Sequence, residues 1–398
     1  MWDDLKDSSF TSEAPDPLKE ANIYAQLINS DRHYYLESGI ERIIADAPWI
    51  NKAQLISEVV KYYDEAISRI PSFTKFPEAK IWVDYVLTRD KKLMELANLS
   101  KQDIAILRST NDYLTFRGYK QFGIKKKKND EKCRTVFIVE TDHGPMHIKN
   151  VDDPITYWKP SPPLPEKAHI SKAWWYHKRF IIDGVGSGLH IDDEPEEIFP
   201  LPVLQMVNMY AYDTFSAVEF LKKYSMFWGG CNIIIFDRKY NAVAIEKCSR
   251  NFFELFQQDE LTGSVHVSGM VCRDPSSPQA KYQKEKRTEY MKLFNLPDDG
   301  PDACFWNVCD KLEIMLRENL RNLGNKPKSD DIIKLFIAPY PSGLRKDALK
   351  LHPQQGLTDY TLMTRCTFFE KKKFLLWQRK SADEGGVYPD SPEICQYE

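Results

Sequence analysis

The sequence lacks the features that mark several large classes of protein. It contains no run of about 18 apolar residues, the length that a transmembrane helix needs. Its first residues, MWDDLKDSSF, have neither the basic region nor the apolar region of a secretory signal. A formal net charge of −3 differs from the strongly basic balance of most nucleic-acid-binding proteins. We therefore expect a cytoplasmic protein with no membrane span and no nucleic-acid partner.

Cysteine pairs and glycine-rich nucleotide loops are also missing. None of the eight cysteines stands in a CxxC pair of the kind that binds zinc. A chain of 398 residues does not need disulfides to build a stable core. The glycine cluster GVGSGLH at 184–190 lacks the final glycine of the dinucleotide-binding fingerprint. These observations predict free thiols, no metal site and no cofactor.

Hydrophobic periodicity divides the chain into a helical part and a part rich in strands. Apolar residues recur at helical spacing over 56–70, and Ser100 with Asp103 predicts a capping box for a helix at 99–114. After residue 133 the pattern becomes alternating and β-branched, with helical stretches at 201–224, 279–294 and 301–320. Strands are predicted at 135–140, 144–151, 178–185, 231–237, 241–248, 264–271, 360–369 and 374–378. This order favours an α+β layered sandwich over a parallel doubly wound sheet.

A β-hairpin is predicted directly after a charged segment, IKKKKNDEK, which ends at Cys133. The sequence TDHG marks a tight turn between two alternating runs. If the hairpin folds about His143, residue 153 lies opposite Cys133. The thiol then lies beside Asn150, Asp152 and Asp153, within a residue or two of register, and cross-strand Cβ atoms are roughly 4.5–5.5 Å apart.

A carboxylate beside a thiol raises the pKa of the thiol, so this arrangement alone does not make a nucleophile. It becomes useful if the chain is cleaved before Cys133, because that residue then carries a free α-amino group with a pKa of about 7.7–8.0. The neutral amine can accept the thiol proton, and the carboxylate can stabilise the resulting ammonium group. In an uncleaved chain, Cys133 is interpreted as an ordinary strand residue.

The motifs C-x-T at 133–135 and K-N-x-D at 149–152 resemble the opening of the β-chain in the N-terminal nucleophile (Ntn) amide hydrolases. That group includes acyl-coenzyme A:6-aminopenicillanate acyltransferase and β-alanyl-dopamine hydrolase, and more distantly acid ceramidase and choloylglycine hydrolase. Segments 99–114, 199–224, 229–252 and 356–378 resemble further parts of the family in the same order. The resemblance covers most of residues 30–380.

The resemblance implies a four-layer αββα sandwich preceded by a helical segment, in one globular unit. Self-cleavage between Lys132 and Cys133 would give an α-chain of residues 1–132 and a β-chain of residues 133–398, which would form an αβ heterodimer. Cys133 would attack a small linear amide or acyl thioester, and the resulting acyl-enzyme would pass its acyl group to water or an amine. Asp152 would orient the new amino terminus, with Asn150 and Lys149 beside it.

Several positions depart from the family pattern. Gly269 and Met270 stand where the family has its oxyanion asparagine and the residue after it, and Thr358 stands where the family has an arginine. The remaining candidates for substrate binding or the oxyanion hole are Asn232, His266 and Ser268. Two alternatives stay open: an unprocessed, catalytically degenerate Ntn-fold protein that binds a small molecule or partner, and an unrelated α+β protein.

Overall fold

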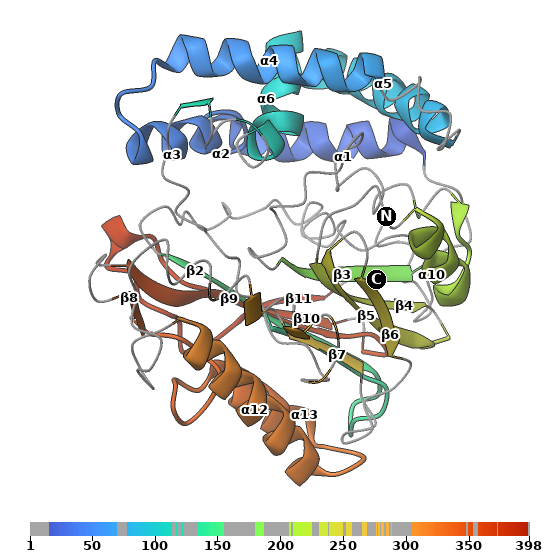
Figure 1. The fold of residues 1–398 in the computed structure, drawn as a ribbon, viewed down its shortest axis with the longest axis vertical. Coiled ribbons are helices and arrows are strands. Elements are labelled where there is room, and N and C mark those ends of the chain that lie inside the picture. The colour runs from blue at the N-terminus through green and yellow to red at the C-terminus, as the bar shows by residue number, and fades with distance from the viewer. Residues whose placement is uncertain are drawn as a thin grey trace.

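Helices and antiparallel strands follow each other in blocks along the chain in the computed structural model (Figure 1). The structure describes residues 16–69, 78–113, 134–154, 180–186, 210–224, 231–237, 239–249, 252–256, 265–268, 305–347, 349–352, 357–371 and 373–396, with some isolated positions between them. The mixed helix and sheet composition confirms the α+β class.

The described residues up to Tyr113 form six helices that lie together as a layer at one end of the molecule (Figure 1). They are α1 (Pro17–Ser30), α2 (Arg32–Leu36), α3 (Ser38–Asp46), α4 (Lys52–Arg69), α5 (Glu78–Ala97) and α6 (Lys101–Tyr113). Helix α6 starts at the predicted capping box, because the Ser100 amide donates to Asp103 at 2.8 Å and the Asp103 amide donates to Ser100 Oγ at 3.2 Å.

The larger sheet has seven strands, ordered β11-β10-β9-β2-β1-β7, with β8 paired to β9. Its strands are β1 (Arg134–Ile138), β2 (Met146–Pro154), β7 (Val265–Ser268), β8 (Leu349–His352), β9 (Leu357–Phe368), β10 (Lys373–Gln378) and β11 (Glu393–Gln396). The smaller sheet is ordered β3-β4-β5-β6, with strands β3 (Phe180–Gly186), β4 (Cys231–Asp237), β5 (Ala242–Ser249) and β6 (Phe252–Phe256). All strand pairs in both sheets are antiparallel.

The predicted hairpin is present as β1 and β2, but its register differs from the prediction by two residues. Arg134 pairs with Asn150, so the hairpin folds about position 142 and not about His143. The last pair of the ladder, Ile138 with Met146, has the same centre, and the Gly144 amide closes the turn by donating to the Thr141 carbonyl at 3.2 Å. Because side chains alternate with a period of two, a shift of two residues keeps every side chain on its predicted face.

The two sheets contact each other through aromatic side chains. Phe137 of β1 stacks on Phe236 of β4 with ring centroids 3.9 Å apart and an interplanar angle of 14°. His147 of β2 lies 5.5 Å from the same Phe236 ring. Odd-numbered residues of β1 and β2 therefore face the smaller sheet, and even-numbered ones face away from it.

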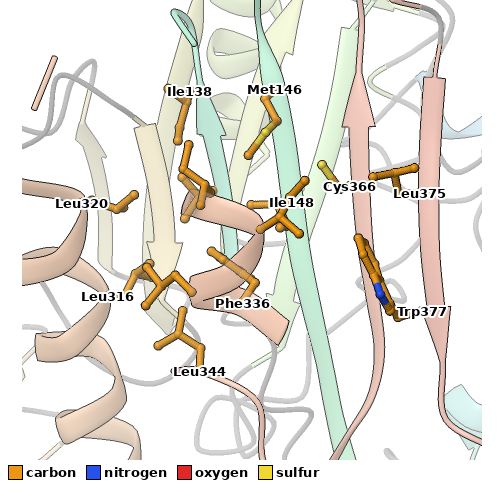
Figure 2. Close-up of a cluster of buried hydrophobic side chains, with 14 of the residues drawn as sticks. Ile138, Met146, Ile148, Leu316, Leu320, Phe336, Leu344, Cys366, Leu375 and Trp377 are labelled. Atoms are coloured by element: carbon orange, nitrogen blue, oxygen red, sulfur yellow. The ribbon is translucent and has the colours of Figure 1, made fainter. Parts of the chain in front are cut away.

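Helices cover the face of each sheet that points away from the other. Helices α12 (Phe305–Leu323) and α13 (Ser329–Ile337) pack on the larger sheet through a cluster of buried apolar residues (Figure 2). Leu316, Phe336, Ile148 and Cys366 are fully buried members of that cluster. Helix α10 (Thr214–Lys223) packs on β4 and β5 together with side chains of α5.

Some predicted elements differ from the structure. The helical stretch predicted at 201–224 is interrupted before α10, because the Asp213 side chain accepts from the Ser216 amide and caps a new helix. Strands β6, β8 and β11, which have four or five residues each, were not predicted. The helix predicted at 279–294 lies largely outside the described residues.

Candidate functional site

The predicted nucleophile, Cys133, lies outside the described residues, as does Lys132 on the other side of the proposed cleavage point. The description of the larger sheet starts one residue later, at Arg134 in β1. Arg134 pairs with Asn150 of β2 on one side and with Ser268 of β7 on the other. The candidate site therefore begins at Arg134 of β1 and extends over the two neighbouring strands, β2 and β7.

Asp152 is fully buried and its carboxylate is surrounded by donors. Arg134 Nη1 lies 2.8 Å from Asp152 Oδ2, and Lys346 Nζ lies 3.2 Å from the same oxygen. Thr361 Oγ1 donates to Asp152 Oδ1 at 2.7 Å. Asp152 is thus held by two buried cations and a hydroxyl group, all within the larger sheet and the loop that precedes β8.

The side chain of Asn150 is buried and hydrogen-bonded to neighbouring elements. Its side-chain amide donates to the Phe336 carbonyl of α13 at 3.0 Å, and its side-chain oxygen accepts from Thr364 Oγ1 at 2.7 Å. Burial raises the pKa of Tyr388, and the protonated Tyr388 hydroxyl donates in turn to Thr364. These contacts tie β2 to α13 and β9, on the face of the sheet that the helices cover.

Lys149 lies on the opposite face of the sheet from Asn150 and Asp152. Even-numbered β2 residues from Met146 to Asn150 point toward α12 and α13, so Lys149 points toward the smaller sheet. In register across the strands, Thr135 of β1 pairs with Lys149, and Lys149 pairs with Arg365 of β9. This row places two basic side chains next to each other between the sheets, where Arg365 is buried.

Asn232 and Glu246 face the same space from the smaller sheet. In β4 and β5, the odd-numbered residues such as Ile233 and Ile245 pack toward α10, so the even-numbered ones point toward the larger sheet. Asn232 and Glu246 are each only 1% exposed, so the sheets enclose an amide and a carboxyl group.

The aromatic contacts show at which end of the two sheets Asn232 and Glu246 lie. Tyr240, in the turn between β4 and β5, has its ring 6.3 Å from Phe369. The Phe369 amide donates to the carbonyl of Pro145, which directly precedes β2 in the β1–β2 loop. The two hairpin loops therefore lie at one end, and Asn232 and Glu246 lie toward the opposite end, where β1 begins.

His266 and Ser268 are on β7, which pairs with β1 on the side away from β2. His266 pairs with Val136 and Ser268 pairs with Arg134, so both residues lie one strand away from the start of β1. Their side chains, and residues Gly269 and Met270, lie outside what the structure describes. Thr358 lies in β9 and pairs with Lys350 of β8.

The structure thus separates four of the predicted site residues into two groups, both toward the end of the two sheets at which β1 begins. Asp152 and Asn150 lie on the helix-covered face, whereas Lys149 and Asn232 lie between the sheets. Lys346 and Glu246 were not predicted from the sequence as residues of the candidate site. A lysine far along the chain gives no sequence signal of burial, but Glu246 does interrupt an apolar strand, NAVAIEKC, where a charge is unusual.

One group in the described chain could offer metal ligands: His33, Glu37 and Glu41 on the surface of α2 and α3. One ligand atom from each of the three residues lies within 4.8 Å of the others, and the two carboxylates lie 3.7 Å from Nδ1 and 3.3 Å from Nε2 of His33. Lys52 also pairs with Glu37 at 3.7 Å. Among the helices of the described chain, none combines the length and apolarity that crossing a bilayer requires.

No protein-family model matches the chain, and no curated protein matches it. Two solved structures, both of variants of the conjugated bile acid hydrolase from Clostridium perfringens, are similar to it at 10% sequence identity. Both cover 68% of this chain, and they match over 90% and 89% of their own chains, with TM-scores of 0.31 and 0.32. Likenesses of this size establish neither a shared fold nor a shared activity.

Proposed function

We propose that this chain is a cysteine Ntn amide hydrolase or acyltransferase that acts on a small linear amide or acyl thioester. One observation carries the proposal. The β1–β2 hairpin brings the residue that follows Cys133 against the K-N-x-D segment, with Arg134 paired to Asn150 and ion-paired to Asp152. The two halves of the motif, which are 18 residues apart in sequence, thus meet at one end of one sheet.

The proposed fold is the four-layer αββα sandwich of that family. Support comes from the order of packing: α12 and α13 on the larger sheet, aromatic contacts between the sheets, and α10 on the smaller sheet. The same proposal makes residues 1–132 an α-chain that stays bound after cleavage. Trp82, Val83 and Val86 of α5 share a buried cluster with α10, and Lys223 pairs with Glu78 at 3.2 Å, which supports a stable αβ heterodimer.

In the proposed reaction, the free α-amino group of Cys133 accepts the thiol proton, and the sulfur attacks the carbonyl carbon of the substrate. The C–N or C–S bond then breaks as the ammonium group returns its proton to the leaving amine or thiolate. Water or an amine then attacks the carbonyl carbon of the acyl-enzyme and loses its proton to the same amino group. The C–S bond to Cys133 breaks, the acyl product leaves, and the ammonium group returns the proton to the Cys133 sulfur. No redox step or cofactor is needed for this sequence.

The oxyanion formed in each attack needs hydrogen-bond donors aimed at it, and removal of one donor typically costs about 10²–10³ in rate. Asn232 is the best candidate for such a donor, because its side-chain amide is buried between the sheets, toward the end where β1 begins. His266, Ser268 and backbone amides of β7 are the further candidates on the adjacent strand. Lys149 and Arg365 would bind polar groups of the substrate on the same face.

A second candidate function is a non-catalytic protein with the same fold that binds a small molecule or a partner. The environment of Asp152 favours it. Arg134, Lys346 and Thr361 already engage both carboxylate oxygens, and Asp152 is completely buried. In this alternative the chain is not cleaved, and the ion pairs have a structural role only.

Denaturing mass spectrometry of purified protein, with and without an electrophilic thiol probe, separates the two functions. The enzyme proposal predicts fragments of residues 1–132 and 133–398 and a single probe adduct on Cys133. The Cys133→Ala variant should remain one intact chain without the adduct. Cys366 provides the matched control, because it is fully buried and burial raises the pKa of its thiol, so Cys366→Ala should leave cleavage and labelling unchanged.

A single intact chain in which the probe spares Cys133 would overturn the enzyme proposal and support the binding protein. Cleavage at 132–133 with labelling of that cysteine would exclude the non-catalytic alternative. Once labelling is established, Asn232→Ala should slow it by about 10²-fold or more if the side chain is an oxyanion donor. Equal rates in Asn232→Ala and the parent protein would remove that residue from the proposed site.

A further inference from the structure

The carboxylate that the sequence assigns to the new amino terminus is already bound to the side chain of the next residue. Arg134 and Asp152 are 4% and 0% exposed in their side chains, and their charged atoms are 2.8 Å apart. Buried charges need a partner of opposite sign, because removal from water is costly. Among the residues that the structure describes, the shortest ion pair of Asp152 is with this side chain of β1.

A second buried cation, Lys346, also contacts Asp152. Lys346 is completely buried and reaches the same Asp152 oxygen at 3.2 Å. Its backbone is fixed on both sides, since the Lys346 amide donates to Thr361 Oγ1 and the Thr361 amide donates to the Lys346 carbonyl, each at 2.8 Å. Arg134, Lys346 and Thr361 together engage both carboxylate oxygens of Asp152, so a new ammonium group at Asp152 would have to share or displace these partners.

Covalent geometry connects this cluster to the nucleophile without any assumption about its side chain. Consecutive Cα atoms are about 3.8 Å apart, so whatever fixes Arg134 also fixes one end of the peptide unit that carries Cys133. A pair of charge-assisted hydrogen-bonding groups is a strong anchor of this kind. The start of β1 needs such an anchor, because cleavage of the chain before residue 133 would remove the covalent restraint on the N-terminal side of β1.

We propose that Arg134, Asp152 and Lys346 form an ion clamp that anchors the start of β1, and that Asp152 is a positioning residue that acts through Arg134 and does not contact the new amino terminus. The inference rests on the proposed function of Cys133 and changes the role of Asp152 within it. It also gives Arg134 a function at a position where the resembled family has threonine.

The test is a double-mutant cycle on the reaction of Cys133 with an acyl electrophile in the full-length protein. The maximal labelling rate and the probe concentration for half-maximal rate are measured for Arg134→Gln, Asp152→Asn and the double variant. Each single variant should lower the maximal rate by about 10–100-fold, as expected for a misplaced nucleophile, and leave the half-maximal concentration within about twofold. The double variant should be no slower than the worse single variant.

Two further variants separate positioning from loss of folding. Arg134→Lys keeps the charge and should restore the maximal rate to within about threefold of the parent protein. Arg89→Gln is the matched control: Arg89 is also 4% exposed and ion-paired, to Glu20 at 3.2 Å and Asp90 at 3.1 Å, but it lies in the helical layer. This variant should lose stability without a change in labelling rate.

The outcomes distinguish the two proposals. If Cys133 labels and the effect of Asp152→Asn multiplies that of Arg134→Gln, Asp152 acts on the amino terminus directly and the clamp inference is overturned. The same holds if Arg134→Lys fails to rescue the rate while remaining folded. If the parent protein is neither cleaved nor labelled at Cys133, the proposed function fails, and the positioning role of Asp152 fails with it.

Discussion

The stacking of Phe137 on Phe236 predicts a measurable coupling between the two sheets. Both rings are fully buried and nearly parallel, with centroids 3.9 Å apart. Replacement of either one by leucine removes the ring contact and leaves a small cavity, so each single variant should lose about 1–3 kcal/mol of stability. The pair itself should contribute about 0.5–1.5 kcal/mol beyond the burial of area.

The measurement is a double-mutant cycle on the free energy of unfolding in urea. The double variant Phe137→Leu/Phe236→Leu should be more stable than the sum of the single effects predicts, by that coupling energy. Ile235→Val provides the control, because Ile235 is equally buried in β4 but packs toward α10. Its coupling to Phe137→Leu should stay within about 0.3–0.5 kcal/mol of zero.

Unfolding of a chain of this size need not be two-state, so the cycle should be repeated by amide hydrogen exchange of the β1 and β4 peptides. Loss of protection in β1 on mutation of Phe236 would report the contact directly. Equal couplings for Phe236 and Ile235, or an unchanged β1 peptide in Phe236→Leu, would refute the face-to-face packing of the sheets and with it the proposed sandwich.

Two further predictions concern the loop after α13 and the helical layer. Gly343→Ala should lower the free energy of unfolding by at least about 3 kcal/mol, because the new Cβ would lie 2.6–2.7 Å from backbone and Cβ atoms. Gly324→Ala should lower it by only about 1–2 kcal/mol, because Gly324 has a φ of +77° but open space around it. Thermal unfolding of both variants measures the difference. Burial raises the pKa of Asp90, but Arg108 and Arg89 outweigh it and the net pKa is lowered. Its stabilisation is therefore present above the unfolded pKa of about 3.9 and lost as the pH falls through the folded value, and Asp90→Asn should flatten the acid branch of an unfolding-midpoint profile.

The local parts of the fold could be predicted from the sequence. The β1–β2 hairpin follows from alternation and a turn sequence that lie within 20 residues of each other, and the capping box at Ser100 involves neighbours only. The register error arose because the composition of the turn does not determine which residue is central. The error had no effect on the faces, since the shift was even.

The environment of Asp152 could not be predicted in the same way. Its hydroxyl donor, Thr361, is 209 residues away in sequence, and Lys346 belongs to a loop whose sequence, PYPSGLRKDALK, is typical of a surface turn. Contacts of this kind depend on how β9 pairs with β2, which no local pattern determines. The motif predicts a role for Asp152 beside the amino terminus of Cys133, whereas its contacts with Arg134, Lys346 and Thr361 become visible only in the structure.

The alternation of β1 and β2 gives a physical reason for an indirect role of Asp152. Arg134 and Asp152 lie on the face covered by α13, and Thr135 and its cross-strand partner Lys149 lie on the face that meets the smaller sheet. A carboxylate on the first face can hold the backbone of β1 rigidly while the second face stays available for substrate. If Asp152 had to bind the amino terminus itself, anchor and substrate would compete for the same side of the strand, and the new ammonium group would have to displace or share Arg134, Lys346 or Thr361.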